Sequence, residues 1–331
     1  MDGLPLFPAL LAAPRRTLKA PIGCVGIGLH SGARVSLRLV PALAGTGIVF
    51  RRTDLGIDIP ARFDHVADTR LCTVLSEHAD GSGARIATVE HVMAALAGAG
   101  VHDAIVEVDG PETPVLDGSA ANFLFLLDCA GLAPAEGPAA GYAAPYAIEV
   151  LRAVRVAEGE GFVELVPNRD AVFDMALSID FAASAIGRQA LSLRLSSTTF
   201  RAELARARTF TLLSEIEALR RAGLALGGSL DNAVVVDGAR VLNPSGLRAP
   251  DEFVRHKLLD AVGDLALAGA PLRGRFKGHR SGHALNNRLL RALFADAANW
   301  RAVPVEDGEG AGFGPLGAWS EARLPLAAAP V

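Results

Sequence analysis

The stretch FVRHKLLDAVGDLAL, residues 253–267, decides the fold class because it predicts an amphipathic helix with an unusual polar stripe. His256, Asp260 and Asp264 follow one another at intervals of four residues among the leucines. Side chains four residues apart lie on the same face of a helix. The flanking leucines indicate burial, and a buried carboxylate needs a partner or a metal ion. The stretch therefore predicts a buried helix whose polar face serves a site.

The chain before this helix mixes strand-like and helix-like patterns. RVSLRLVP (34–41) has the two-residue period of a strand, whereas TVEHVMAALAGAG (88–100) and ANFLFLLDCAGL (121–132) predict helices. We expect Thr88 to be the N-cap of the first helix and Gly100 to end it. The predicted fold class is therefore α+β, with each sheet packed against helices.

The second half repeats this mixture of elements. Residues 146–181 predict a meander of strands, and residues 197–223 predict a largely helical segment. NAVVVDGARVLN (232–243) predicts a hairpin that turns at Asp237 and Gly238, and NNRLLRALFADAANW (286–300) predicts the last helix. Two halves of similar size and order suggest an ancient duplication.

The length of 331 residues favours two domains, because single cores stop growing near roughly 250–300 residues. The segment APAEGPAAGYAAP (133–145) is rich in Ala, Pro and Gly and is the best linker candidate. We expect a flexible leader over 1–16, domain I over 17–130, a linker over 131–146, domain II over 147–305 and a flexible tail over 306–331.

The composition excludes several classes of protein. The formal net charge is −4 and basic runs are lacking, which argues against a nucleic-acid partner. The cysteines Cys24, Cys72 and Cys129 form no CxxC pair, so neither a disulfide framework nor a thiolate zinc cluster is expected. The N-terminal residues lack the order of a signal peptide, and no stretch reaches the roughly 18 apolar residues of a membrane helix. We expect a cytoplasmic protein.

His256 and Asp260 have the spacing of two ligands for one metal ion. Imidazole and carboxylate both bind zinc, and a catalytic zinc site has about three protein ligands and one open position. His91 at the start of the 88–100 helix is a candidate third ligand, and Glu90 beside it a candidate general base. Asp264, one turn further along, is a candidate support for a catalytic histidine. The alternatives are a surface His–Asp pair and a glutamate that complements a helix dipole.

Two further segments carry polar groups that suit catalysis or substrate binding. His283 in GHRSGHALNN follows a Ser-Gly turn and suits stabilisation of an oxyanion or protonation of a leaving amine. Lys277 and Arg280 nearby suit phosphate, and the hydroxyl of Thr209 suits a polarised carbonyl. The alternative for this region is a glycine-rich turn with a solvated basic edge.

Apolar residues of the 206–233 segment are candidates for the lining of a tunnel. They are Phe210, Ile216, Leu224 and Ala225. Ordinary core packing is the alternative for each of them.

Taken together, these motifs resemble one family. In chain order they are GIGLHSG (26–32), TVEHVMAALAGAG (88–100), RARTF (206–210), LGGSLDNA (226–233), DEFVRHKLLDAVGDL (251–265) and SGHALNN (281–287). They resemble the UDP-3-O-acyl-N-acetylglucosamine deacetylases, which carry out the committed step of lipid A biosynthesis in Gram-negative bacteria. The resemblance extends from about residue 17 to about residue 305 and implies two α+β domains with the active site between them.

The resemblance also implies roles for individual residues. It implies the metal ligands His91, His256 and Asp260, the catalytic residues Glu90, His283, Asp264 and Thr209, and the substrate-binding residues Lys257, Phe210, Ile216, Ala225, Gly228 and Arg280. One zinc ion per chain is implied, with ferrous iron as an alternative, and the 206–233 insert is expected to hold the acyl chain. Many members carry Lys where this chain has Arg280, and the two cations bind phosphate differently.

The expected partner is the small-molecule substrate, an acylated UDP-N-acetylglucosamine. We expect a monomer with at most transient contact with the inner membrane. Two alternatives remain at this stage: a hydratase or phosphoesterase that uses the same polar cluster, and a metal-free protein that binds acylated nucleotide sugars.

Overall fold

The computed structural model describes residues 14–137 and 145–305. The expected tail over 306–331 lies outside the described residues, as do residues 1–13 of the expected leader and 138–144 of the expected linker. The described parts of the leader and linker meet, because β1 (Arg16–Leu18) pairs antiparallel with β10 (Leu132–Pro134).

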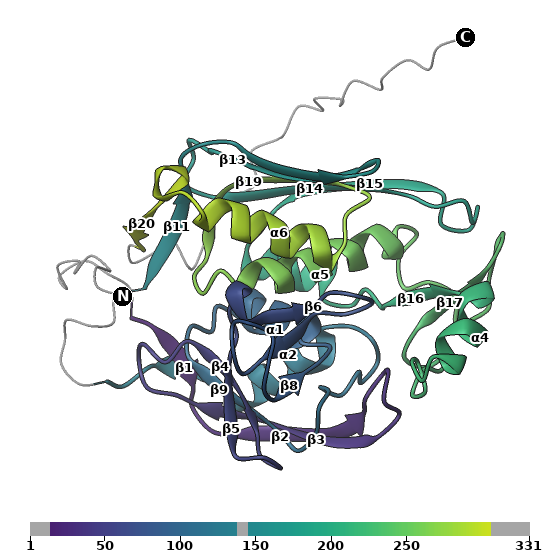
Figure 1. Cartoon of the computed structure of the whole chain (residues 1–331), viewed down its shortest axis with the longest axis horizontal. Helices are drawn as coiled ribbons and strands as arrows, with labels where there is room; N and C mark the ends of the chain where they lie inside the picture. Colours follow the sequence, from purple (N-terminus) through teal and green to yellow (C-terminus); the bar gives the residue numbers. More distant parts are fainter. Residues whose placement is uncertain (1–13, 138–144, 306–331) are drawn as a thin grey trace, which may run out of the picture.

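The described residues form two large sheets, of five and seven strands, that enclose two layers of helices, together with three sheets of two or three strands, which confirms the α+β prediction (Figure 1). Besides β1 and β10, the first half contains β2 (Ile22–Ile27), β3 (Arg34–Pro41), β4 (Ile48–Arg52), β5 (Ile57–Pro60), η1 (Phe63–His65), β6 (Val66–Asp68), β7 (Val74–Ser76), β8 (Arg85–Ile86), α1 (Glu90–Ala99), β9 (Ala104–Val108) and α2 (Ala121–Ala130). The second half contains β11 (Tyr146–Val150), β12 (Val154–Glu158), β13 (Gly161–Val166), β14 (Phe173–Asp180), β15 (Arg188–Arg194), α3 (Ser197–Thr199), η2 (Phe200–Leu204), β16 (Phe210–Leu212), α4 (Leu213–Arg221), β17 (Val234–Asp237), β18 (Arg240–Val241), α5 (Glu252–Ala266), β19 (Leu272–His279), α6 (His283–Phe294), η3 (Ala297–Asn299) and β20 (Trp300–Pro304).

The first sheet has the strand order β2-β3-β9-β4-β5. Strand β3 has the alternation that its sequence predicts, because Val35, Leu37 and Leu39 are buried and alternate with more exposed residues. Strand β9 pairs antiparallel with β3 and parallel with β4. Helices α1 and α2 lie on the side of this sheet that faces the second half (Figure 1).

The second sheet is built around β19, which pairs antiparallel with β13 and parallel with β14 and β11. The predicted meander over 146–181 is therefore wrong, because β19 lies between β13 and β14. The local sequence of β13 and β14 could not predict this arrangement, because β19 begins almost one hundred residues after β14 ends. Helices α5 and α6 lie between this sheet and α1 (Figure 1).

The segment 197–223 is largely helical, as predicted, because α3, η2 and α4 lie in it, although β16 interrupts it and pairs parallel with β17. Two other local predictions need correction. The last helix begins at His283 and ends at Phe294, and Trp300 starts β20, which pairs with β11. Val89 holds the N-cap position of α1, whereas Thr88 has a φ of 60° and its hydroxyl donates to Glu112 at 3.1 Å.

Other local predictions are confirmed. Strands β17 and β18 form the expected hairpin, with Asp237 paired to Arg240. Gly100 ends α1 in the left-handed conformation, with a φ of 72°.

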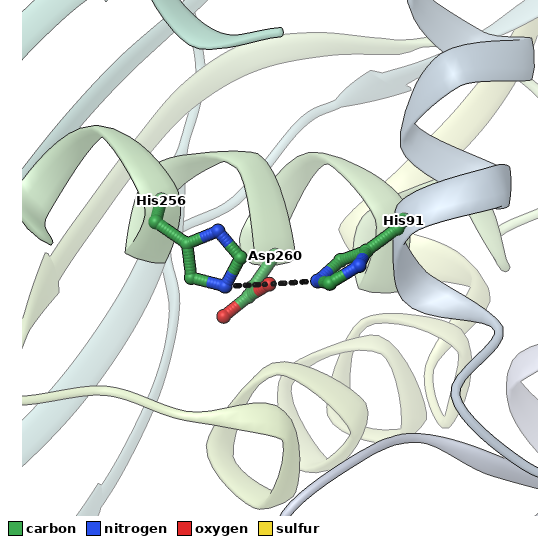
Figure 2. A group of neighbouring side chains, drawn as sticks. All are labelled: His91, His256 and Asp260. Carbon is green, nitrogen blue, oxygen red and sulfur yellow. Dashed lines mark ion pairs between the residues drawn. The ribbon is translucent and has the colours of Figure 1, made fainter. Parts of the chain in front are cut away.

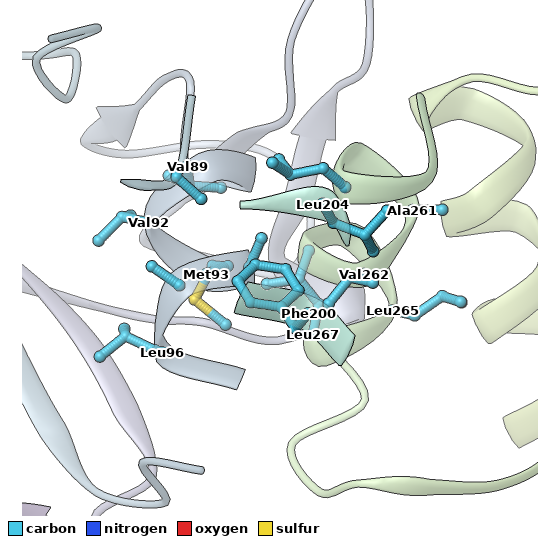
Figure 3. Packing of buried hydrophobic residues seen from close by; sticks show 14 of the residues in the cluster. Val89, Val92, Met93, Leu96, Phe200, Leu204, Ala261, Val262, Leu265 and Leu267 are labelled. Carbon is cyan, nitrogen blue, oxygen red and sulfur yellow. The ribbon is translucent and has the colours of Figure 1, made fainter. Parts of the chain in front are cut away.

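The two halves meet where α1 packs against α5. The residue that permits this approach is Gly263, since a Cβ there would lie 2.0 Å from the carbonyl oxygen of Glu90. Around this contact the buried side chains of Met93, Phe200 and Val262 belong to one apolar cluster (Figure 3). The start of α1 is therefore held directly against the middle of α5.

Within the described residues, no helix is both long enough and apolar enough to cross a bilayer.

Candidate metal and catalytic site

Three side chains converge where α1 meets α5. His256 and Asp260 stand one turn apart on α5, and His91 reaches them from the first turn of α1 (Figure 2). Asp260 Oδ1 lies 3.3 Å from His256 Nε2 and 3.6 Å from His91 Nε2. The three side chains are buried, and one ligand atom from each lies within 4.8 Å of the others.

The donor set fits a divalent cation. Among the described residues, the buried Asp260 Oδ1 has no hydrogen-bond partner, although such an atom normally has one. Donor atoms held about 2.1 Å from a tetrahedral zinc ion lie roughly 3.4 Å from one another, close to the two distances to Asp260 Oδ1. His256 Nδ1 lies 3.1 Å from the carbonyl oxygen of Ala207 and donates to it, which leaves Nε2 with a free lone pair.

The protonation states of these groups suit the same role. Burial lowers the pKa of His256 to about 4, so its imidazole is neutral near pH 7. Burial raises the pKa of Asp260, but His256 and Lys257 outweigh this effect, and the pKa lies well below its usual range. Lys257 Nζ lies 3.1 Å from Asp260 Oδ2, the oxygen that faces away from the two histidines. Asp260 is therefore an anion with one oxygen held by Lys257, while the other faces the two histidines without a hydrogen bond.

Glu90 lies beside this cluster as the first residue of α1. It is 4% exposed, and its Oε2 accepts a hydrogen bond of 3.0 Å from the backbone amide of Thr73. Burial raises the pKa of Glu90. A raised carboxyl pKa lies nearer the operating pH, which suits a group that takes up and returns a proton.

His283 faces the site from the first turn of α6 and is held by Asp264. The distance from His283 Nδ1 to Asp264 Oδ2 is 2.9 Å, and Asn286 Nδ2 donates to the same oxygen at 2.8 Å. Burial lowers the pKa of His283, but Asp264 and Glu90 raise it, to about 9 in balance. His283 is therefore a buried imidazolium near pH 7. Its Nδ1 proton is held by Asp264, which leaves Nε2–H to donate elsewhere.

A cavity of about 210 Å³ opens beside Thr209. The expected residues Phe210, Ile216, Ala225 and Gly228 line it with Thr209, and Leu224 is not among the lining residues. Leu29, His30 and Leu71, from the first half of the chain, also line this cavity and were not predicted from the sequence. These three residues come from loops without a periodic pattern.

A second cavity, of about 300 Å³, is lined by two cationic side chains and one acidic side chain. The cations are Lys257 and Arg280, and the acidic residue is Asp180. The Arg280 guanidinium pairs with the exposed carboxylate of Glu160, and its backbone φ is 46°. The other basic candidate, Lys277, lies on the exposed face of β19.

A buried ion pair fastens the segment before Thr209 to the start of α5. Glu252 accepts from the backbone amide and guanidinium of Arg208, at 2.9–3.1 Å, and from the backbone amide of Arg248 at 2.6 Å. The side chains of Arg208 and Glu252 are 4% and 1% exposed. No local sequence pattern marks this pair, because its members are 44 residues apart.

Comparison with known proteins gives a consistent result. A family model described as "UDP-3-O-acyl N-acetylglycosamine deacetylase" matches residues 15–295. A protein of Idiomarina loihiensis is 45% identical over 310 residues, which are 93% of this chain and 98% of that protein. Proteins of Phenylobacterium zucineum and Acidithiobacillus ferrooxidans are 49% and 48% identical, over 87% of this chain and 95% and 92% of theirs. Each of the three is named UDP-3-O-acyl-N-acetylglucosamine deacetylase.

Proposed function

Because the chain belongs to the UDP-3-O-acyl N-acetylglycosamine deacetylase family, we propose that it hydrolyses the N-acetyl group of UDP-3-O-acyl-N-acetylglucosamine in lipid A biosynthesis. The chain is thus an amide hydrolase. The observation that carries this assignment is the buried cluster of His91, His256 and Asp260, with one carboxylate oxygen that has no hydrogen bond and an acid–base pair beside it.

His91, His256 and Asp260 are the residues that would hold the metal ion, which we propose to be zinc. The ion supplies a Lewis acid, which lowers the pKa of water and withdraws charge from a carbonyl oxygen. The lack of a hydrogen bond at Asp260 Oδ1 and the neutral state of His256 support this assignment. Ferrous iron is the alternative, because it accepts the same ligands.

Glu90 and His283 divide the proton transfers between them. Glu90 takes a proton from the attacking water, and the water oxygen bonds to the acetamide carbon. His283, charged near pH 7 and oriented by Asp264, donates toward the oxyanion that forms. When the C–N bond breaks, His283 or Glu90 returns a proton to the amine. The products are acetate and the free amino sugar.

The two cavities suit the two ends of the substrate. The cavity between Phe210 and Ala225 is lined mainly by apolar groups and suits the fatty acyl chain, with Ile216 and Gly228 in its wall. Thr209 lies at the same cavity and is the candidate contact for the reacting carbonyl.

The second cavity brings Lys257 and Arg280 together, and these two cations suit the diphosphate. A forked Arg at this position meets phosphate in a planar, bidentate way.

The test combines metal analysis with an acetate-release assay on the acylated UDP-sugar. The wild type should carry one zinc ion per chain and release one acetate per free amine. His256→Ala should lose both metal and turnover, whereas His283→Ala should keep the metal and lose turnover by about 10²–10³. Retained zinc and near-normal acetate release in His256→Ala would refute the ligand assignment.

The same experiment separates the alternatives. A hydratase or phosphoesterase releases no acetate, and a metal-free binding protein contains no zinc and is indifferent to chelators. The metal-free alternative also leaves the buried Asp260 Oδ1, which has no hydrogen bond, without an explanation.

We propose two domains, domain I over 17–130 and domain II over 147–305, with the 206–233 insert in the second. The contact of β1 with β10 supports a first unit that closes on itself. We further propose a cytoplasmic monomer, which sedimentation of the purified protein and cell fractionation would test.

A further inference from the structure

Thr73 contacts both of the carboxylates that the proposed chemistry uses. It lies immediately before β7, in a loop that enters the site between α1 and α5, and it is 2% exposed. Its backbone amide donates to Glu90 Oε2 at 3.0 Å, and its hydroxyl donates to Asp264 Oδ1 at 2.6 Å. Glu90 belongs to the first half of the chain and Asp264 to the second.

The backbone of Thr73 is fixed to α1 by two hydrogen bonds. Besides its amide bond to Glu90, its carbonyl oxygen accepts from the backbone amide of Val89 at 3.3 Å. Neither bond involves the side chain. A substitution that keeps the shape of the side chain therefore leaves the contact with α1 in place.

The hydroxyl holds the other side of the site. Asp264 Oδ2 already accepts from His283 and Asn286, so the hydroxyl of Thr73 is the donor to the remaining oxygen, Oδ1. A carboxylate with donors on both oxygens cannot rotate about its Cβ–Cγ bond without breaking a charge-assisted bond. The position of Oδ2, and with it the orientation of the His283 ring, depends on this hydroxyl.

We infer that Thr73 is a positioning residue, whose hydroxyl holds Asp264, and through it the His283 imidazolium, in a fixed position relative to Glu90. This inference rests on the proposed function, because it assigns Thr73 to the reaction carried out by Glu90 and His283. Thr73 touches neither metal nor substrate in this scheme.

The decisive variants are Thr73→Val, which removes only the hydroxyl, and Thr73→Ser, which keeps it. Thr73→Val loses a hydrogen bond to a charged carboxylate, so we expect its kcat to fall by about ten-fold or more. KM should stay within about two-fold, and zinc should remain at one per chain. Thr73→Ser should recover most of the lost turnover. Thr17→Val, which removes a buried hydroxyl bonded to the backbone amide of Ala42, is the control for general loss of stability and should keep kcat.

A double-mutant cycle tests whether Thr73 acts through Asp264. In an Asp264→Asn background, Thr73→Val should cost much less than it does alone, because the two changes remove one shared interaction. An additive loss would overturn the inference, as would a Thr73→Val enzyme with unchanged kcat, a loss explained by missing zinc, or a Thr73→Ser enzyme as slow as Thr73→Val. Acetate release by the wild type in the same assay tests the proposed function separately.

Discussion

Replacing Gly263 with Ala should damage catalysis far more than it damages stability. A Cβ at position 263 would lie 2.0 Å from the carbonyl oxygen of Glu90, whereas ordinary contact begins at 3.4 Å, so the helices must separate by about 3.4 − 2.0 = 1.4 Å. Such overpacking costs about 1–3 kcal/mol, and the better helix propensity of Ala returns about 1 kcal/mol. The net loss of stability should therefore be about 0–2 kcal/mol.

The catalytic cost has a different origin. Separation of α1 from α5 moves Glu90 and His91 away from His256 and Asp260, which lie on α5. A displacement of about 1 Å can cost about 10²-fold in rate. We expect Gly263→Ala to lose about 10²-fold in kcat/KM for acetate release and to bind zinc more weakly.

Denaturant unfolding, zinc content and acetate release on the same preparations check this prediction. Ala266→Gly, in the last turn of the same helix, is the control, because it costs up to about 1 kcal/mol without pushing on α1. It should keep near-normal activity. A folded Gly263→Ala enzyme with activity within two-fold of the wild type would show that the close helix contact does not set the geometry of the site.

Three further predictions concern the metal, the proton donor and the acyl cavity. Chelation should abolish acetate release, and added zinc should restore it; activity that survives metal removal would exclude a metal hydrolase. Because the pKa of His283 is raised to about 9 and its charged form is required, kcat should fall as pH rises through about 9; Asp264→Asn removes the main raising influence, so its pH–rate profile should fall at lower pH. Ala225→Leu should raise KM for long acyl chains more than for short ones; equal effects would place the chain elsewhere.

The fold class and the polar face of α5 could be predicted from the sequence because both depend on local periodicity. His256, Asp260 and Asp264 share a face whatever the rest of the chain does, and Leu37 marks β3 by alternation. His91 required more than periodicity, since its place beside α5 depends on the packing of Gly263 against the start of α1.

The remaining features depend on contacts between distant parts of the chain. Thr73 lies 17 residues from Glu90 and 191 from Asp264, so no local pattern marks it. Thr88 has the residue type of an N-cap, but its hydroxyl donates to Glu112 instead. Phe210 follows a helix-like segment, yet it pairs with Val234 in a parallel sheet.

The buried pair of Arg208 and Glu252 has a consequence for how the chain avoids misfolding. If the segment before Thr209 slid by one residue along α5, both charges would be left buried without a partner. Breaking a buried pair in this way costs about 3–5 kcal/mol. In the native alignment, the carbonyl oxygen of Ala207 meets His256 Nδ1 and fixes the tautomer of that imidazole. The ion pair thus disfavours misaligned forms of the protein in which His256 Nδ1 would lack the carbonyl oxygen of Ala207 as its partner.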